Sequence, residues 1–225
     1  MWAARLGIAA VVAFVVGPAI AHFRLVPALV GFLVFDIGGL LGLIALVIGI
    51  VGAVRGHGAG MGLVLGGVVT VAFFAIAARG GKVPRINDIT TDTANPPQFV
   101  AAITIDANRG RDMAYPGPSF AEQQRAGYPD LAPLQLPGSP DEVFKRVEAA
   151  ARQMPTWQLT RTDLAAHALE GVDTTALFRF QDDFVIEVRP QDSGSVVQMR
   201  SKSRDGKGDI GANAARIQGF FAQLR

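Results

Sequence analysis

The sequence predicts an α+β protein with N-terminal transmembrane helices followed by a two-layer soluble domain, a four-stranded antiparallel meander flanked by two helices. Three observations support this prediction. Charge is nearly absent from residues 1–80, which hold four basic residues and one acidic residue, whereas residues 81–225 hold seventeen basic and eighteen acidic residues. Eight of the 13 prolines lie between Pro84 and Pro137. Helical and alternating apolar periods dominate residues 139–225. We therefore expect a membrane region (1–80), an extended proline-rich lead-in (81–138) and a folded core (139–225).

Composition excludes several classes of function. The 225 residues are 50% hydrophobic, and the mean hydropathy is +0.31, which is high for a soluble domain of this length. The formal charge of +2 divides into +3 for residues 1–80 and −1 for the remainder, so no nucleic-acid partner is expected. Because the chain has no cysteine, disulfides, iron–sulfur clusters, Cys-based zinc sites and thiol nucleophiles are excluded. We expect no cofactor and no bound metal, and we assign no catalytic residue.

Three uncharged runs account for the membrane region. They comprise sixteen, eighteen and twenty residues (6–21, 37–54 and 59–78), lengths close to those that span about 30 Å of hydrocarbon. The predicted helices are about 4–22, 30–54 and 59–78, and the lipid bilayer is the expected partner. The first run has an alternative interpretation as a secretory signal, with Arg5 before an apolar stretch and Ala19–Ala21 as a small-x-small cleavage site.

Asp36 falls inside the second predicted helix if that helix begins near Val30. A central aspartate costs roughly 3 kcal/mol on insertion, while the fifteen Val, Leu, Ile and Phe residues from Val30 to Val51 together return about 6 kcal/mol. The segment therefore still inserts. Asp36 is interpreted either as a buried proton- or ion-binding group or, preferably, as a residue at headgroup level.

Both interpretations of the first segment place the C-terminal domain outside the cytoplasm. We therefore expect a multi-pass membrane protein with an extracytoplasmic C-terminal domain. The positive-inside rule argues against this topology, because the topology leaves most of the basic residues that flank the helices outside the cytoplasm. Small residues four apart, including Gly38 and Gly42 on the second segment and Gly62 and Gly66 on the third, predict a tight hairpin of these two helices, turned at residues 55–57.

The soluble part has a lead-in and a core. Apolar residues such as Ile86, Phe99 and Leu134 recur through the lead-in, so we expect it to pack along the core as extended chain. In the core, Ser139 is a predicted N-cap with Pro140 at the first helical position and Glu142 at the capping-box position. Strand patterns follow at residues 157–160, 167–180, 184–189 and 197–200, and a terminal helix carries an apolar stripe from Ile217 to Leu224.

Three stretches of the soluble part resemble a known family. They are residues 84–92 (PRINDITTD), residues 173–183 with Asp-Thr-Thr at one end and Gln-Asp-Asp at the other, and residues 200–216, which begin Arg-Ser-Lys-Ser-Arg. In this order they resemble the membrane-bound type of the bacterial family of domain of unknown function 1499 (DUF1499), over roughly residues 84–225. The resemblance implies a location in the cell envelope and no particular chemistry. Together with the predicted membrane spans, it implies a multi-pass protein of the bacterial inner (plasma) membrane with a periplasmic C-terminal domain.

The polar residues of these stretches are the candidate ligand-binding residues. They are Asp88, Thr90, Thr91, Asp92, Asp173, Thr174, Thr175, Asp182, Asp183, Arg200, Ser201, Ser203, Arg204, Asp209, Asn213 and Arg216. In the third stretch, basic residues flank a glycine loop at a helix N-terminus, an arrangement that favours an anion. The alternative is that Asp209 caps that helix and the arginines pair with Asp182, Asp183 and Asp205.

The acids and threonines have structural alternatives too. Adjacent residues of a strand point to opposite faces, so Asp182 and Asp183 share a site only in a turn, where we expect them, exposed to solvent. The pairs Thr90-Thr91 and Thr174-Thr175 are either turn and strand-edge residues or the two sides of one polar recess.

Two functional hypotheses follow. The preferred one is a membrane-anchored extracytoplasmic binding or interaction domain that contacts an anionic lipid or an envelope protein. The alternative is an envelope hydrolase or transferase with Asp182 or Asp183 as base and Arg200 or Arg204 on a substrate phosphate. A transport role, resting on Asp36 alone, ranks third. The alternative enzyme requires these acids and arginines to line one cleft.

Overall fold

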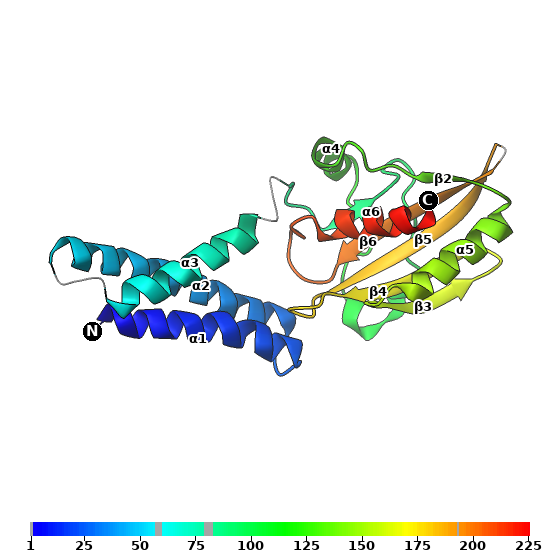
Figure 1. Ribbon diagram of the computed structural model, residues 1–225. Helices are drawn as coiled ribbons and strands as arrows, with labels where there is room; N and C mark the ends of the chain where they lie inside the picture. Colours follow the sequence, from blue (N-terminus) through cyan, green and yellow to red (C-terminus); the bar gives the residue numbers. More distant parts are fainter. Residues whose placement is uncertain (1, 57–59, 79–82, 193) are drawn as a thin grey trace. The chain divides into compact units, whose positions relative to one another are not determined.

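The computed structural model describes residues 2–56, 60–78, 83–192 and 194–225 and divides into two units (Figure 1). Unit 1 comprises Met1–Gly81 together with the loop Thr175–Arg179, and unit 2 comprises Lys82–Thr174 and Phe180–Arg225. Unit 1 is helical, whereas unit 2 contains a sheet with helices. The α+β prediction, with apolar helices first, is confirmed.

Unit 1 contains α1 (Trp2–His22), α2 (Ala28–Val54) and α3 (Met61–Ala78). Within the described residues, these are the three helices that are long and apolar enough to cross a membrane. The helices α1 and α2 begin two residues earlier than the sequence predicts. The predicted start of the third helix at residue 59 and the predicted turn residue His57 lie outside the described residues.

Glycines bring the helices of unit 1 close together. A Cβ atom at Gly49 of α2 would lie 2.7 Å from the Leu63 Cα of α3, and one at Gly66 of α3 would lie 2.5 Å from the Leu46 nitrogen of α2. The predicted close packing of the second and third helices is therefore confirmed at these positions. Gly38 and Gly62 differ, since a Cβ at Gly38 would lie 2.6 Å from the Phe14 nitrogen of α1 and one at Gly62 would clash with the Ala3 carbonyl carbon of α1. The assignment of these two glycines to the contact between the second and third helices was wrong.

Unit 2 is built on one antiparallel sheet. Its strands are β1 (Asp88–Thr90), β2 (Leu134–Pro137), β3 (Trp157–Asp163), β4 (Ala168–Thr174), β5 (Gln181–Gln191) and β6 (Gly194–Ser203). The order is β1-β6-β5-β4-β3, and β2 also pairs with β6. The meander β3 to β6 is confirmed, although β4 ends at Thr174 and not at residue 180 as the sequence predicts. Among the described residues, the sheet has six strands and not four. Without β1 and β2, one edge of β6 would leave its backbone groups unpaired, and these two lead-in strands pair with it.

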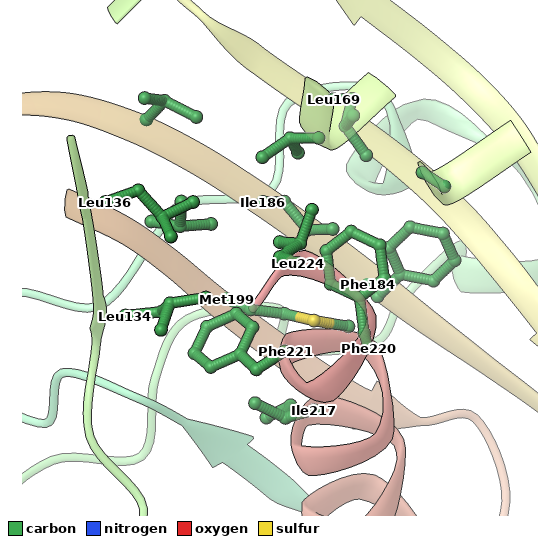
Figure 2. Close-up of a cluster of buried hydrophobic side chains, with 14 of the residues drawn as sticks. Leu134, Leu136, Leu169, Phe184, Ile186, Met199, Ile217, Phe220, Phe221 and Leu224 are labelled. Carbon is green, nitrogen blue, oxygen red and sulfur yellow. The ribbon is translucent and has the colours of Figure 1, made fainter. Parts of the chain in front are cut away.

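Two helices, α5 (Pro140–Gln153) and α6 (Ala212–Leu224), cover one face of the sheet. The Ser139 side chain accepts a hydrogen bond from the Glu142 N–H and the Glu142 side chain accepts one from the Ser139 N–H, which confirms the predicted capping box. In Figure 2, Phe220 and Leu224 of α6 point toward Phe184 and Ile186 of β5. We call this face of the sheet the helix face.

The lead-in is more regular than the sequence predicts. Besides β1 and β2, it contains α4 (Pro118–Gly127) and the short 3₁₀ helices η1 (Ala102–Thr104) and η2 (Asp106–Asn108). The pattern of α4 is weak because the helix is short and polar, with only a proline at its first position as a start signal. Phe99, Ala102 and Met113 pack with Val185 of β5. Val185 is on the opposite face of β5 from Phe184, which we call the coil face.

Candidate functional site

Strand alternation divides the candidate residues between the two faces. Asp182 and Asp183 are adjacent on β5, and their side chains are bonded to different groups on the helix face and the coil face, respectively. Only 3% of Asp182 and none of Asp183 is exposed. The expectation of a solvent-exposed turn was therefore wrong, because β5 begins at Gln181 and includes both residues.

The coil face carries a buried ionic cluster of Asp88, Arg200 and Lys202. Arg200 Nε and Nη2 each donate to one Asp88 carboxylate oxygen at 2.8 Å, a bidentate arrangement. Lys202 Nζ donates to Asp88 Oδ2 at 2.7 Å. Asp88 and Arg200 have no exposed surface. Asp88 comes from the lead-in and the two bases from β6, so the cluster joins β1 to β6 in a fixed register.

Arg200 also holds the lead-in onto the coil face. Its Nη1 donates to the Pro97 carbonyl at 3.2 Å and its Nη2 to the Met113 carbonyl at 2.9 Å. The guanidinium lies over the rings of Phe99 and Tyr115, at 4.8 and 5.6 Å from their centroids. One buried arginine thus positions two lead-in segments that are separated in sequence.

Asp183 is the centre of a second coil-face cluster. Arg204 Nη2 and Nε donate to its two carboxylate oxygens at 2.6 and 3.0 Å, and Asn108 Nδ2 donates to Oδ2 at 2.9 Å. Arg111 donates to the Asn108 side chain and to the Ser203 carbonyl. Arg204 is therefore paired with Asp183, one of the three acids that the alternative interpretation assigns to the arginines.

A third polar cluster occupies the helix face. Arg216 of α6 donates to Asp173 of β4 at 2.6 Å and to Asp182 of β5 at 2.5 Å. Its Nη1 also donates to Ser201 Oγ at 2.8 Å and to Asn213 Oδ1 at 2.5 Å. Asn213 Nδ2 completes the cluster by donating to Ser203 Oγ at 2.9 Å. These partners dock α6 on the ends of three strands, and each of the six residues is less than 10% exposed.

Asp209 caps the turn that leads into α6. Its Oδ1 accepts the Gly211 N–H at 2.9 Å and its Oδ2 accepts the Asn213 N–H at 3.0 Å. Gly211 is in the left-handed region with φ +84°. The carboxylate thus occupies N–H groups that would otherwise face an anion at this helix start.

The last residues of the stretch 84–92 hold the lead-in backbone through hydrogen bonds. Thr90 exchanges two hydrogen bonds with the Gln124 side chain of α4, its N–H donating at 3.0 Å and its carbonyl accepting at 2.6 Å. Thr91 extends the pairing with β6, since its Oγ1 accepts the Met199 N–H. Asp92 Oδ1 accepts the N–H groups of Ala94 and Asn95, both at 3.0 Å.

The two threonine pairs do not form one recess. Across the sheet, Thr90 of β1 pairs with Arg200 of β6, Arg200 pairs with Val185 of β5, and Val185 pairs with Glu170 of β4. The strands β6 and β5 therefore separate β1 from β4. Thr174 is at the far end of β4, four residues beyond Glu170. Thr175 belongs to the loop assigned to unit 1.

Several important residues were missed in the sequence. Glu170 is fully buried and accepts hydrogen bonds from the N–H groups of Val100, Ala101 and Ala102. An acid inside an apolar strand was the available signal for it. Gln124 and Asn108 gave no signal, because polar residues in a polar lead-in are unremarkable until their partners are known.

A groove lies on the surface of the lead-in, above the first cluster. It has a volume of about 580 Å³ and is lined by Thr93, Ala94, Pro96, Gln98, Ala114, Tyr115, Gly117, Pro118, Ala121 and Arg125. Arg125 donates to the Thr93 hydroxyl at 2.9 Å and forms no ion pair with a described residue. The walls include the neighbours of Pro97 and Met113, the two carbonyls held by Arg200. We call this hollow the lead-in groove.

Burial and, second to it, the nearby Asp88 carboxylate raise the pKa of the Tyr115 phenol to about 12, against a lowering by Arg200 and Arg125. Burial and Asp209 likewise raise the pKa of Tyr128 to about 12. The groove therefore presents a neutral hydroxyl and a cationic guanidinium at physiological pH.

The arrangement does not bring the proposed enzyme residues into one cleft. Asp182 is paired with Arg216 on one face, while Asp183, Arg200 and Arg204 are paired on the other. Among the described residues, no group of three or more His, Cys, Asp or Glu side chains is arranged to hold a metal ion.

The family model for a protein of unknown function (DUF1499) matches residues 88–224, beginning at the buried Asp88 and ending at the last residue of α6. The chain belongs to the DUF1499 family. A search of curated proteins finds no match to it. The matched region of this DUF1499 chain contains all three polar clusters, and α1 to α3 precede it.

We expect Asp88→Asn to destabilise unit 2 by about 3–5 kcal/mol, because it leaves a buried guanidinium and an ammonium without their carboxylate. Denaturant unfolding of the full chain in detergent measures this change. The matched control is Asp106→Asn, which removes an exposed pair with Arg109 and should leave stability unchanged. Equal stability of the two variants would contradict the structural role of the cluster.

The two tyrosines, Tyr115 and Tyr128, should ionise only near pH 12 in the folded chain. Their folded pKa lies above the ordinary value of 10.0, so the stability that they contribute is present below pH 10 and is lost as pH rises from 10 through 12. Phenolate absorbance at about pH 11 should be small in the native protein and large in denaturant. The variant Tyr128→Phe leaves Tyr115 as the one tyrosine whose ionisation is measured. Ionisation of its phenol near pH 10 in the native protein would show that burial does not raise its pKa.

Proposed function

We propose that this DUF1499 protein is a membrane-anchored binding domain that presents the lead-in groove to an anionic component of the bacterial cell envelope. The anchor is α1 to α3 in the inner membrane, and the soluble unit is extracytoplasmic. The observation that carries the proposal is the lead-in groove itself. Arg125, which forms no ion pair with a described residue, lies at its wall, and a buried ionic cluster lies beneath it.

Chain topology supports the extracytoplasmic assignment. Consecutive membrane spans alternate in direction, so a chain whose N-terminus is inside leaves α3 on the outer side. A cleaved first segment followed by α2 and α3 gives the same result. The soluble unit follows α3 in the chain, and it therefore lies outside in both cases.

The buried motif residues take a supporting role in this proposal. Arg200 holds the carbonyls of Pro97 and Met113, and Asp92 holds the N–H groups of Ala94 and Asn95. These segments form most of the groove wall. Preorganised walls reduce the entropy lost on binding, which is a reason to fix exposed loops with buried ion pairs. Asp88, Thr90, Thr91, Asp92 and Arg200 thus serve the ligand by positioning the residues that touch it.

The charge at the groove favours an anionic ligand. Among the described residues, Arg125 donates one hydrogen bond, to Thr93, of the five that a guanidinium can donate, and Tyr115 remains a neutral hydroxyl below about pH 12. Pro96, Pro118 and Ala121 add apolar surface around this polar pair. A lipid headgroup and an acidic protein segment share the chemistry that such a groove recognises.

Ala114→Trp should fill the groove and abolish recovery of the bound component, because Ala114 is exposed and lines the hollow. Lipids and proteins that copurify with the detergent-solubilised chain are identified and compared with those of wild type. Arg125→Gln should lower recovery while leaving the shape intact. The control is Ala165→Trp, at an exposed position in the β3–β4 turn. A lipid or protein that copurifies with wild type but not with Ala114→Trp is identified as the partner. Equal recovery from all variants would refute binding in the groove.

A reporter fused after Arg225 tests the orientation. We expect activity from a reporter that works only outside the cytoplasm, and none from one that works only inside it. A control fusion at Arg55, which follows α2 and precedes α3, should give the opposite result. An active cytoplasmic reporter after Arg225 would overturn the assignment.

A further inference from the structure

The loop Thr175–Arg179 connects β4 to β5 but belongs to unit 1, together with the apolar helices. Its central residues, Ala176, Leu177 and Phe178, are apolar. The strands next to the loop have polar residues at their near ends, since β4 ends at Thr174 and β5 begins at Gln181. An apolar tip between polar strand ends is unusual for a loop that only reverses the chain, because such turns are generally built from Gly, Pro, Asn, Asp and Ser.

Two sets of contacts place the loop within unit 1. The Phe178 ring meets Phe32 and Phe35 of α2 edge-on, with centroids 5.2 and 5.5 Å apart. The His22 Nδ1 at the end of α1 lies 3.0 Å from the Ala176 carbonyl oxygen and donates to it. The loop is therefore held to the end of α1 and to the first turns of α2.

Helix lengths give the depth of these contacts. The 21 residues of α1 extend about 31 Å, which matches the hydrocarbon thickness, so His22 lies near one boundary of the bilayer. Phe32 and Phe35 lie four and seven residues after the start of α2, or about 6 and 10 Å along its axis. In a bilayer that α1 spans, Phe178 is therefore at the edge of the hydrocarbon and not above the headgroups.

The apolar surface of the loop continues that of the neighbouring turn. Leu177 is 51% exposed, and the turn between α1 and α2 exposes Phe23 and Leu25 by 71% and 72%. Arg24 lies between the latter two, and Arg179 ends the loop. Large apolar side chains next to arginines match the boundary between lipid tails and anionic headgroups.

We propose that Thr175–Arg179 is a lipid-contacting loop whose Leu177 side chain inserts into the bilayer at the level of the turn between α1 and α2. The occupant of this surface is the bilayer itself, because the exposed residues are continuous with the membrane-spanning helices. This role is independent of any ligand in the lead-in groove.

The absence of cysteine from the chain allows a direct test. Leu177→Cys is labelled with an environment-sensitive fluorophore and the full chain is reconstituted into vesicles. The vesicles contain a lipid that carries a doxyl quencher near the headgroup end of its acyl chain. We expect a blue shift and strong quenching, equal to those of Leu25→Cys. The matched control is Leu164→Cys, an exposed leucine in the β3–β4 turn, which should be neither shifted nor quenched.

A Leu177 probe that behaves like the Leu164 probe would overturn the proposal. A probe that is blue-shifted but not quenched by the doxyl lipid would also overturn it, since it would indicate burial against protein or a second copy of the chain. Because Leu177 and Leu164 are both exposed, neither substitution removes a core contact, and folding of each labelled variant is checked by its circular dichroism.

Discussion

The bidentate pair between Asp88 and Arg200 is the interaction on which the architecture of unit 2 depends. It joins β1 to β6, and the same guanidinium holds two further lead-in carbonyls. Burying both charges carries a large desolvation cost, which is offset only when every donor and acceptor is satisfied. The cost makes this pairing selective: any other register would leave a charge buried alone. Its contribution is specificity of the lead-in path more than net stability.

Alternation along the strands then separates the remaining charges. Asp183 with Arg204 and Asp182 with Arg216 form clusters on opposite faces of the same strand pair, so neighbouring acids support different structures. The helix-face cluster docks α6, and the coil-face clusters dock the lead-in. Both faces of the sheet are covered, by α5 and α6 on one side and by lead-in segments on the other, so residues that look like surface charges in the sequence are buried.

This arrangement changes what the family motifs mean. The polar residues of the three stretches of this DUF1499 chain are mainly buried and hydrogen-bonded to one another, whereas the lead-in groove lies at the surface. The residues that line this groove, such as Ala114, Tyr115 and Arg125, are less distinctive in the sequence. The buried motifs fix the positions of these residues, as supporting residues generally do for a binding surface.

Local sequence signals were sufficient to predict the apolar helices, the capped α5, the apolar stripe of α6 and the alternating strands of the meander. Each depends on a period or a cap within a short window. Only the tertiary structure decided the addition of β1 and β2 to the sheet, the presence of α4, and which arginine pairs with which acid. In the three polar clusters, the paired arginines and acids lie 21 to 112 residues apart, and no local pattern encodes a contact over that distance. Asp88 and Arg200 could be recognised as candidates, but that both are buried follows from the lead-in folding over them.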